Sequence, residues 1–422
     1  MYLVYPLDDP FLIMTNHTAD SYSEENLTWL VSEVGQEWLD RVQDLRKENP
    51  DILALLGILR KQLAPEKGSL LLHQLELRER AKGKFPFSDS MLFSPTLFEQ
   101  STDFSLACYK AVRFRPYQRI ADLCSGLGGD LLGLAASLAD REFYVYDRSP
   151  IALALTKANI GLLPENRHQF SFHQQILDKN FLDLSSCDCW HFDPDRRAQG
   201  QRTTQWEAME PSPECGRLYL ELCENSAWKL APATEMPPDW ELICEREWIG
   251  HHRECKQQVA WFGGMTDSAG LRRATVIDGE GKPLGSFLGD PDPPLQLGSL
   301  AAYLYEPDPT LLAAGIIGDF AEKLEVAGLI PRGGYLTGDR LLDHPMLQTF
   351  RILEILPYQV KNLRRHLRQR DVGHLEMKCR GIKVDLEGLR KQLRLEGSLT
   401  QTLILTRFRE RRVAILAERI EA

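Results

Sequence analysis

The sequence lacks several features that would place the protein outside a reducing, aqueous environment. Its nine cysteines include no CxxC pair, and their number is odd, which is untypical of a secreted disulfide framework. No uninterrupted apolar run reaches the length that crosses a bilayer. The first residues, MYLVYPLDDPFLIM, have no basic stretch before their apolar residues, so we expect no secretory signal. These absences favour a cytoplasmic protein with free thiols.

A complete set of metal ligands is also missing from any one stretch. Cys187 and Cys189 stand within an apolar run, and no second cysteine pair accompanies them. A structural zinc site needs about four such ligands, so buried core thiols are the simpler interpretation. His251, His252 and Cys255 lack further ligands near them, and we expect a loop there. We therefore predict no metal site.

Charge is unevenly distributed along the 422 residues. From Arg351 to Ala422 the chain carries 17 Lys and Arg against 9 Asp and Glu, whereas the remaining residues carry 33 against 51. A basic segment on an acidic chain is typical of a localised surface for a polyanion. The alternative is a solvated helix whose arginine stems cover apolar surface. The basic helix expected at 359–370 carries the candidate contacts Lys361, Arg364, Arg365 and Arg368.

A chain of this length is expected to form two to four domains. Residues 1–88 predict a helical domain, in which one apolar helix face runs from Leu27 to Val42 and Asn49-Pro50-Asp51 ends that helix. The stretch GDPDPP at 289–294 is the best linker candidate. Short strands and helices alternate beyond it, and we expect a turn at 335–340.

The most informative stretch is IADLCSGLGGDLLG, from Ile120 to Gly133. An apolar, strand-like run leads into a glycine-rich turn, and leucines and alanines at helical spacing follow. Strand, glycine turn and helix form the first unit of a nucleotide-binding α/β domain. The dinucleotide pattern GxGxxG is incomplete, because Leu131 stands at its last glycine. The stretch therefore indicates a nucleoside ligand of another kind.

Further strand and helix signals alternate after this turn. We expect strands at 142–147, 168–174, 187–192, 240–248, 257–262 and 272–278. The early alternation predicts a parallel sheet with helices on both faces, and the later strands are expected to be antiparallel. Ligands of such a sheet bind outside the carboxyl ends of the parallel strands. Residues 218–221 fit a strand or the start of a helix.

Acidic residues mark this expected ligand site. Asp147 ends the second strand, where a carboxylate can accept hydrogen bonds from both hydroxyls of a ribose. Asp130 stands at the start of the helix after the glycines, and its carboxylate would repel a phosphate. A nucleoside cofactor with a positive or zwitterionic tail fits these two acids better than a dinucleotide does. S-adenosylmethionine has these features.

The stretch D-x-C-x-G-x-G-G-D at 122–130 resembles motif I of the class I S-adenosylmethionine-dependent methyltransferases. The segments LFEQSTDFSLACYKAVRF at 97–114, DPDRR at 193–197 and LEMKCRGIKVDLEGLRKQL at 375–393 are similar to a narrower bacterial family of such methyltransferases, which ends in a THUMP-like domain. The resemblance covers residue 90 to the end.

The resemblance implies an α/β fold with a Rossmann-like methyltransferase domain at 89–299. The helical domain at 1–88 would precede it, a small ferredoxin-like segment at 300–340 would follow, and a THUMP-like α+β domain would occupy 341–422. S-adenosyl-L-methionine is the implied cofactor, and RNA is the implied partner of the basic C-terminal residues.

The resemblance also implies roles for individual residues in cofactor binding. The glycine loop would lie under the methionine moiety, Asp122 would hold that loop and the amino group, and Asp147 would bind the ribose. Thr102 stands where related RNA guanine-amino methyltransferases have a threonine, although Ser101 or Thr102 could equally cap the helix that follows. The full set implied at the cofactor is Thr102, Asp122, Cys124, Gly126, Gly128, Gly129, Asp130, Asp147 and Arg148.

The resemblance implies an acceptor site at the stretch DPDRR, residues 193–197. Asp193 and Pro194 occupy the place of the Asp/Asn-Pro-Pro-aromatic motif of amino-group methyltransferases, in which the acid and a carbonyl accept from an exocyclic amine. This chain has Asp195 and Arg196 where proline and the aromatic ring would be. Arg196 and Arg197 could stack on a base or hold a phosphate, or they could pair structurally with the nearby acids.

The leading hypothesis from the sequence is a cytoplasmic methyltransferase that methylates an amino group of a nucleotide in RNA. The first alternative is a methyltransferase for a small molecule or a protein. The second is a protein that binds S-adenosylmethionine or RNA without turnover.

Overall fold

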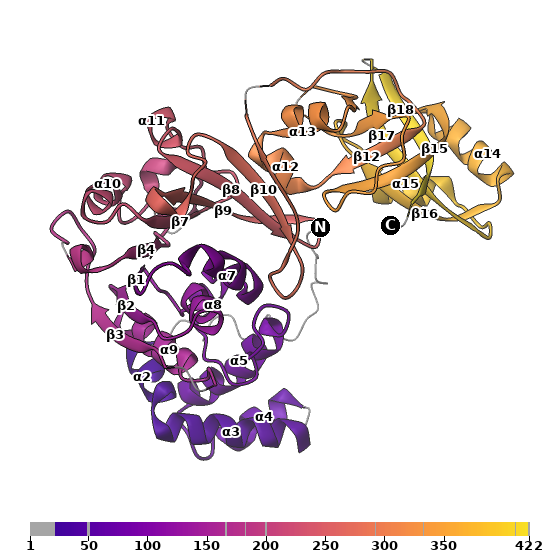
Figure 1. Ribbon diagram of the computed structural model, residues 1–422. Coiled ribbons are helices and arrows are strands. Elements are labelled where there is room, and N and C mark those ends of the chain that lie inside the picture. Colours follow the sequence, from indigo (N-terminus) through magenta and orange to yellow (C-terminus); the bar gives the residue numbers. More distant parts are fainter. Residues whose placement is uncertain are drawn as a thin grey trace. The chain divides into compact units, whose positions relative to one another are not determined.

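The computed structural model describes residues 22–48, 51–164, 167–181, 183–198, 201–291, 293–331, 333–409 and 411–420. The chain forms two compact units (Figure 1). Unit 1 comprises Met1–Thr203 and Glu207–Ser226, and unit 2 comprises Thr204–Trp206 and Ala227–Ala422. Residues 1–21 of the predicted helical domain and Asn49-Pro50 of the predicted break lie outside the described residues.

The N-terminal apolar face belongs to two helices, and the prediction of one helix there was wrong. α2 (Glu24–Val31) ends at Ser32, whose backbone is extended, and α3 (Glu33–Glu48) begins directly after it. The Ser32 hydroxyl accepts from the Gly35 amide at 3.3 Å, as an N-cap does. Periodicity alone does not reveal such a break, because buried apolar residues recur in both helices.

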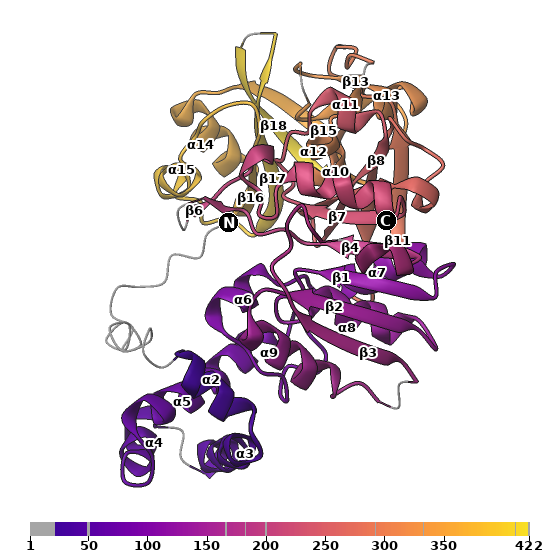
Figure 2. The same cartoon turned by 90° about the vertical axis from the view of Figure 1, so that its left-hand side faces the viewer.

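The helices α4 (Ile52–Leu59) and α5 (Pro65–Ala81) complete this part of unit 1 (Figure 2). Leucines of α2 to α5 form one apolar core, which also contains Leu92 and Leu155. Leu155 lies on α9 (Pro150–Ile160), and the Asn159 amide group of the same helix donates to the Leu92 carbonyl at 3.1 Å. The helical part is therefore joined to the α/β part of unit 1 by a shared core.

The sheet of unit 1 contains four parallel strands in the order β4-β1-β2-β3. They are β1 (Arg119–Leu123), β2 (Glu142–Asp147), β3 (Gln169–Gln174) and β4 (Cys189–Phe192). The predicted parallel α/β arrangement is confirmed. A short hairpin of β5 (Arg197–Ala198) and β6 (Gln201–Arg202) follows β4. Residues 218–221 belong to a helix, α10 (Pro213–Leu222), which the Ser212 side chain caps.

Two short helices precede β1, and the second packs closely on the helix that follows it. They are α6 (Pro95–Gln100) and α7 (Phe104–Ala111), and α8 (Gly129–Ser137) comes after β1. A Cβ atom on Gly133 would lie 2.3 Å from Cβ of Ala107, so only glycine permits this approach of α7 and α8. α7 is thereby held beside the glycine-rich turn.

Unit 2 begins with a mixed sheet in the order β11-β10-β8-β9, in which β10 is parallel to β8. The strands are β8 (Cys244–His251), β9 (Glu254–Phe262), β10 (Arg272–Ile277) and β11 (Pro283–Gly289), and β7 (Ser226–Leu230) precedes them. The strand predicted at 240–248 was wrong at its start, because Pro238–Glu241 form helix α11. Proline at the first helical position favours that turn.

The second sheet of unit 2 has seven strands in the order β13-β14-β12-β15-β18-β17-β16. They are β12 (Tyr303–Pro307), β13 (Ala327–Gly328), β14 (Leu336–Gly338), β15 (Leu347–Pro357), β16 (Val372–Cys379), β17 (Leu399–Phe408) and β18 (Arg411–Arg419). The turn predicted at 335–340 is therefore a strand, because Leu336–Gly338 pair with both β12 and β13. The predicted linker at 289–294 lies between β11 and β12, and its Asp292 is outside the described residues.

Helices cover both ends of this second sheet. α14 (Val360–Gln369) and α15 (Leu386–Leu393) pack their leucines on one face of β16, β17 and β18. α12 (Pro309–Ala314) and α13 (Ile317–Lys323) share a core with Tyr305 of β12 and Leu336 of β14. Among the residues that the structure describes, no helix is long and apolar enough to cross a membrane.

Candidate functional site

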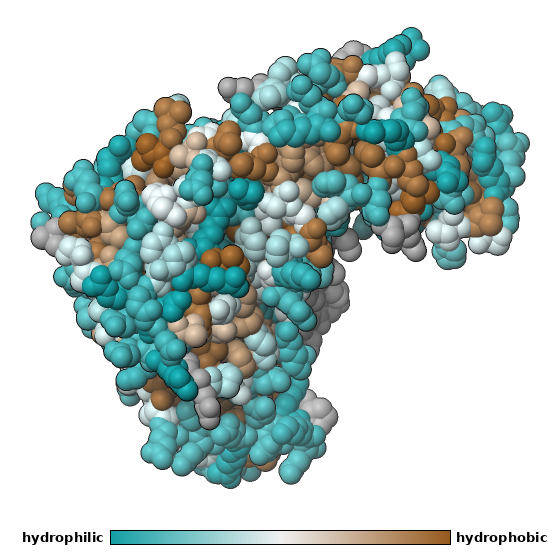
Figure 3. All heavy atoms as spheres, viewed as in Figure 1, coloured by the Kyte–Doolittle hydropathy of each residue, from teal (hydrophilic) through white to brown (hydrophobic). Residues whose placement is uncertain are grey.

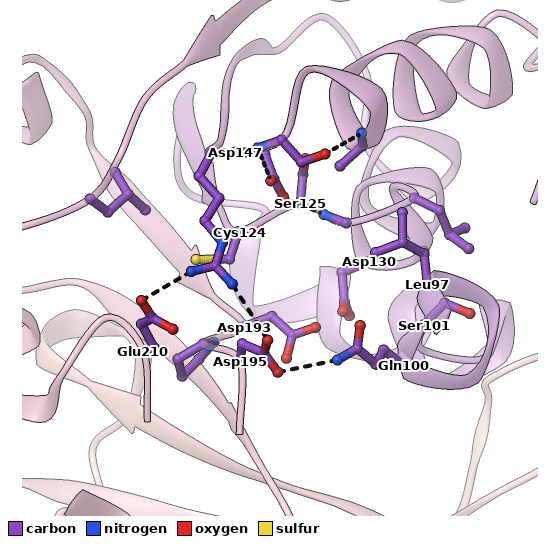
Figure 4. Close-up of a pocket in the computed structure, with 18 of the residues that line it drawn as sticks. Leu97, Gln100, Ser101, Cys124, Ser125, Asp130, Asp147, Asp193, Asp195 and Glu210 are labelled. Carbon is purple, nitrogen blue, oxygen red and sulfur yellow. Dashed lines mark hydrogen bonds and ion pairs between the residues drawn. The ribbon is translucent and has the colours of Figure 1, made fainter. Parts of the chain in front are cut away.

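A cavity of about 300 Å³ opens at the carboxyl ends of the four parallel strands of unit 1. Residues that directly follow β1, β2, β3 and β4 all contribute to its wall, and α6 and the loop before α7 close another side (Figure 4). This is the place where a parallel α/β sheet binds its ligands. The site lies entirely within unit 1.

The turn after β1 has an unusual backbone. Gly126 and Gly128 have φ angles of 60° and 83°, and Cys124 has a φ of 65°, which is uncommon for a residue with a side chain. A Cβ on Gly128 would also lie 2.9 Å from Cγ2 of Thr156. The turn thus exposes the backbone of Cys124, Ser125 and Gly126 to the cavity. Gly128 itself does not line the cavity, and its role is to shape the turn.

Asp147 at the end of β2 is held by the backbone on both sides. Its two carboxylate oxygens accept from the Gly126 amide at 3.0 Å and from the Ser149 amide at 2.8 Å. Burial raises the pKa of Asp147, and these two backbone hydrogen bonds oppose that rise. A carboxylate has about four acceptor positions, so Asp147 can also accept from hydroxyl groups of a ligand.

The loop after β4 brings Asp193, Pro194, Asp195 and Arg196 to the cavity. Asp195 accepts from the Gln100 side chain at 3.2 Å and lies 3.7 Å from the Arg148 guanidinium. The other guanidinium nitrogen of Arg148 pairs with Glu210 at 3.0 Å. Figure 4 shows this chain of contacts along one side of the cavity. The side chain of Arg197 lies outside the described residues.

Four predicted cofactor residues remain, and three of them line the cavity: Thr102, Gly129 and Asp130. Thr102 lines the cavity, and its hydroxyl donates to Oδ2 of Asp130 at 2.7 Å. The suggestion that Ser101 or Thr102 caps α7 was wrong, because the N-cap of that helix is Asp103. Asp122 lies behind the cavity wall, where its Oδ1 is 2.9 Å from Nδ1 of His191. A direct contact between Asp122 and a ligand amino group therefore does not follow from this geometry.

The cavity lining also includes residues to which the sequence assigned no individual role: Leu97, Gln100, Ser125, Ile176 and Glu210. Ile176 could have been found, because it follows the third parallel strand by two residues and strand ends form the site. Its side chain is 74% exposed, which is unusual for isoleucine. Glu210 could not have been found, since only the backbone bridge between Asp195 and Glu210 brings it to the cavity.

No group of three or more His, Cys, Asp or Glu side chains is arranged to hold a metal ion within the described part of the chain. Cys187 and Cys189 are buried, and the cysteines of the described residues are all free thiols. His251 belongs to β8 rather than to the loop that we expected, because its backbone pairs with Glu254 of β9.

Two families match separate parts of the chain. Residues 347–419 match the THUMP domain-like family, and residues 23–81 match a domain of unknown function. The first match contains β15 to β18, α14 and α15. The second contains α2 to α5.

Longer similarity is found to known proteins. Two proteins from strains of Mycobacterium tuberculosis, CDC 1551 / Oshkosh and ATCC 25618 / H37Rv, are described as uncharacterized S-adenosylmethionine-dependent methyltransferases. Each is 27% identical over 351 residues, which is 78% of this chain and 90% of the relative. The fold resembles a crystal structure from Porphyromonas gingivalis W83 that is described as a candidate methyltransferase, with a TM-score of 0.71, 22% identity, and coverage of 85% of this chain and 92% of that one.

The parallel sheet with its glycine turn, the cavity at the strand ends and these similarities agree with one another. The chain is a homologue of S-adenosylmethionine-dependent methyltransferases, with N-terminal helices, a Rossmann-like α/β fold and a THUMP-like C-terminal domain.

Proposed function

We propose that this protein transfers the methyl group of S-adenosylmethionine to an amino group of a nucleotide in RNA. The observation that carries the proposal is the arrangement of one cavity. Asp147 and the glycine turn lie on one side of it, and the Asp193-Pro194 loop lies on the other (Figure 4). A nucleoside cofactor and an amine acceptor would then meet between them.

The cofactor side fits S-adenosylmethionine. Oγ of Ser125 is buried and has no hydrogen-bond partner among the described residues, so it is available to a polar group of a ligand. Asp147 would accept from the ribose hydroxyls, and Ile176 and Leu177 offer apolar contact for a base next to it. When bound, the cofactor supplies a methyl group that is already activated on a sulfonium, so the protein has mainly to orient the acceptor.

The acceptor side is acidic. Asp193, Asp195 and Glu210 line it together with Arg148 and Arg196. Carboxylate and carbonyl oxygens accept from an exocyclic amine, whereas they repel a bare phosphate. Asp193 would hold the acceptor amine so that its lone pair points at the methyl group. No aromatic ring follows Pro194, and the planar guanidinium of Arg196 would stack on the base instead.

The RNA part of the proposal depends on unit 2. Lys361, Arg364, Arg365 and Arg368 follow one another at helical spacing and line a shallow hollow on α14. Leu363 and Leu367 on the opposite side of the helix are buried in the sheet core. In the view of Figure 3, hydrophilic side chains cover the end of unit 2 where α14 lies.

These cations of α14 differ from other basic residues of the THUMP-like domain in their ion pairing. Arg370 pairs with Glu354, and Arg419 pairs with Glu376. By contrast, the described residues contain no ion-pair partner for Lys361, Arg364 or Arg365. Unpaired cations on one helix face are typical of a surface that contacts phosphates. The exposed Arg411 and Arg412 at the start of β18 would add to this surface.

The test is to incubate the purified protein and methyl-labelled S-adenosylmethionine with RNA, protein and metabolite fractions from cells that lack it. We expect the label in RNA with the native protein and none with Asp193→Ala, which removes the side-chain acceptor. The matched control is Asp267→Ala, which removes an exposed carboxylate in unit 2 and should label RNA normally. Label that enters only the protein or the metabolite fraction would refute the RNA substrate.

A further inference from the structure

Four ionisable side chains lie in a row at and behind the cavity wall of unit 1. The ammonium of Lys110 pairs with Oδ1 of Asp130, and Nε2 of His191 lies 3.7 Å from the same oxygen. The other ring nitrogen of His191 lies 2.9 Å from Asp122. The side chains of Lys110 and His191 are each only 1% exposed. The row therefore runs through the protein interior from α7 to β1.

Only one member of this row reaches the cavity. Asp130 lines the cavity together with Thr102, which donates to its second oxygen at 2.7 Å. Lys110 and His191 do not line the cavity. Any effect of Lys110 on a ligand is therefore exerted through Asp130.

A buried ammonium is costly unless a carboxylate compensates it, and a buried carboxylate is costly unless a cation compensates it. Lys110 and Thr102 satisfy opposite oxygens of Asp130, and this fixes the plane of the carboxylate at the first turn of α8. Burial raises the pKa of Asp122, with His191 opposing the rise and the nearby Asp130 adding to it. The Lys110 ammonium beside Asp130 offsets the repulsion between the two carboxylates.

The place of Asp130 determines which part of a ligand it meets. Asp147 lies at the end of β2 and suits the ribose, whereas Asp130 lies at the opposite end of the glycine turn, next to the loop before α7 (Figure 4). A carboxylate at this second end would attract the ammonium group of an amino-acid tail.

We propose that Lys110 is a positioning residue, which holds Asp130 in the orientation that recognises the amino-acid tail of the cofactor. This inference rests on the proposed function, because it assumes that an S-adenosyl amino acid binds in the cavity. In this proposal Lys110 does not contact the cofactor, but it sets the affinity for the amino-acid half of the cofactor.

The test compares two ligands that both lack the sulfonium charge and that differ in the tail. S-adenosylhomocysteine has the amino-acid tail, and 5′-methylthioadenosine lacks it. Lys110→Met keeps an unbranched side chain, one atom shorter than that of lysine, and removes its charge. We expect it to weaken S-adenosylhomocysteine binding about 10- to 100-fold, as for the loss of one charge-assisted hydrogen bond. Binding of 5′-methylthioadenosine, measured by calorimetry, should stay within about twofold. An equal loss for both ligands, or no loss for either, would overturn the proposal.

A double variant distinguishes a role of Lys110 through Asp130 from a general structural effect of losing Lys110. Asp130→Asn removes the carboxylate that Lys110 orients, and Asp130→Asn with Lys110→Met leaves no uncompensated buried charge in this pair. We expect both variants to bind S-adenosylhomocysteine equally weakly. A further loss on adding Lys110→Met would show that Lys110 does not act through Asp130. If the native protein binds neither ligand, the proposed function itself fails.

Discussion

Asp147 shows how one side chain links the fold to the chemistry of the site. Its oxygens accept from the Gly126 and Ser149 amides, so it fixes the glycine turn and the start of α9 together. The same carboxylate lines the cavity. In the proposed function, Asp147 would therefore link the shape of the turn to the recognition of a ribose.

Replacing Asp147 by alanine is expected to weaken S-adenosylmethionine binding by about 10- to 100-fold, because hydrogen bonds from both ribose hydroxyls to a charged acceptor are lost. Isothermal titration calorimetry measures the change. The matched control is Asp178→Ala, at an exposed aspartate outside the cavity lining, which should leave the affinity unchanged. Unchanged binding in Asp147→Ala would contradict the ribose assignment.

The affinity should also depend on pH through Asp147. Because burial raises the pKa of this carboxyl above its ordinary value of 3.8, protonation begins at a higher pH than for an exposed aspartate. A protonated acid accepts fewer hydrogen bonds, so affinity for the cofactor should fall as the pH is lowered through the raised pKa. In Asp147→Asn the affinity should be weaker and flat over the same range. An equal pH response of both proteins would show that another group titrates.

Among single residues, those that directly end a strand were the site residues that the sequence predicted best. Asp147 and Asp193 both follow from that rule, because the carboxyl ends of parallel strands meet at one edge. Thr102 was ambiguous, since a threonine before a helix is typical of a cap and only tertiary contact joins it to Asp130. Asp122 is buried against His191, which is 69 residues away in the chain, so no local sequence pattern predicts this contact.

At the scale of single elements, α14 combines two faces with different tasks. Its leucines belong to the core of the THUMP-like domain, and its cations face outward. The sequence predicted this helix well, because apolar and basic residues both recur at helical spacing. It did not predict α11 or β14, which depend on proline at a helix start and on pairing with strands distant in the chain.

Removing the basic face should weaken RNA binding and leave the cofactor site intact. The triple variant Lys361→Ala, Arg364→Ala, Arg365→Ala is expected to lower RNA affinity by about tenfold or more at moderate salt and to flatten its salt dependence. Filter binding over a salt series, with S-adenosylmethionine titrations beside it, measures both effects. The control removes three exposed cations elsewhere, Arg60→Ala, Lys61→Ala and Lys282→Ala. An equal loss in the control would mean that net charge alone governs binding.

At the scale of the molecule, the C-terminal modules share one sheet. β12 pairs with β15, so strands on both sides of the predicted boundary at 340/341 belong to a single hydrogen-bonded structure. Leu304 and Tyr335 pack in the same core as Ile404 and Ile415. The turn and linker residues in the sequence could not reveal this shared sheet, because the pairing is between segments that are distant in the chain.

Deleting residues 341–422 should therefore destabilise unit 2 as well as remove RNA contacts. The deletion exposes the edge of β12 and the core around Leu304, and exposed strand edges promote aggregation. We expect a lower thermal midpoint and reduced solubility, measured by calorimetry and sedimentation. A truncated protein as stable as the full chain would show that the two parts of the sheet fold independently. Point variants on α14 are for this reason the cleaner probe of RNA binding.

The most direct test of the central claim is nucleoside analysis of RNA taken from cells that lack the protein, after incubation with the purified protein and methyl-labelled S-adenosylmethionine. The proposal predicts label on the exocyclic nitrogen of one nucleoside with the native protein, and none with Asp193→Ala. Label on carbon or on a ribose oxygen, or label that Asp193→Ala leaves unchanged, would contradict the assignment of this cavity to amino-group methylation of RNA.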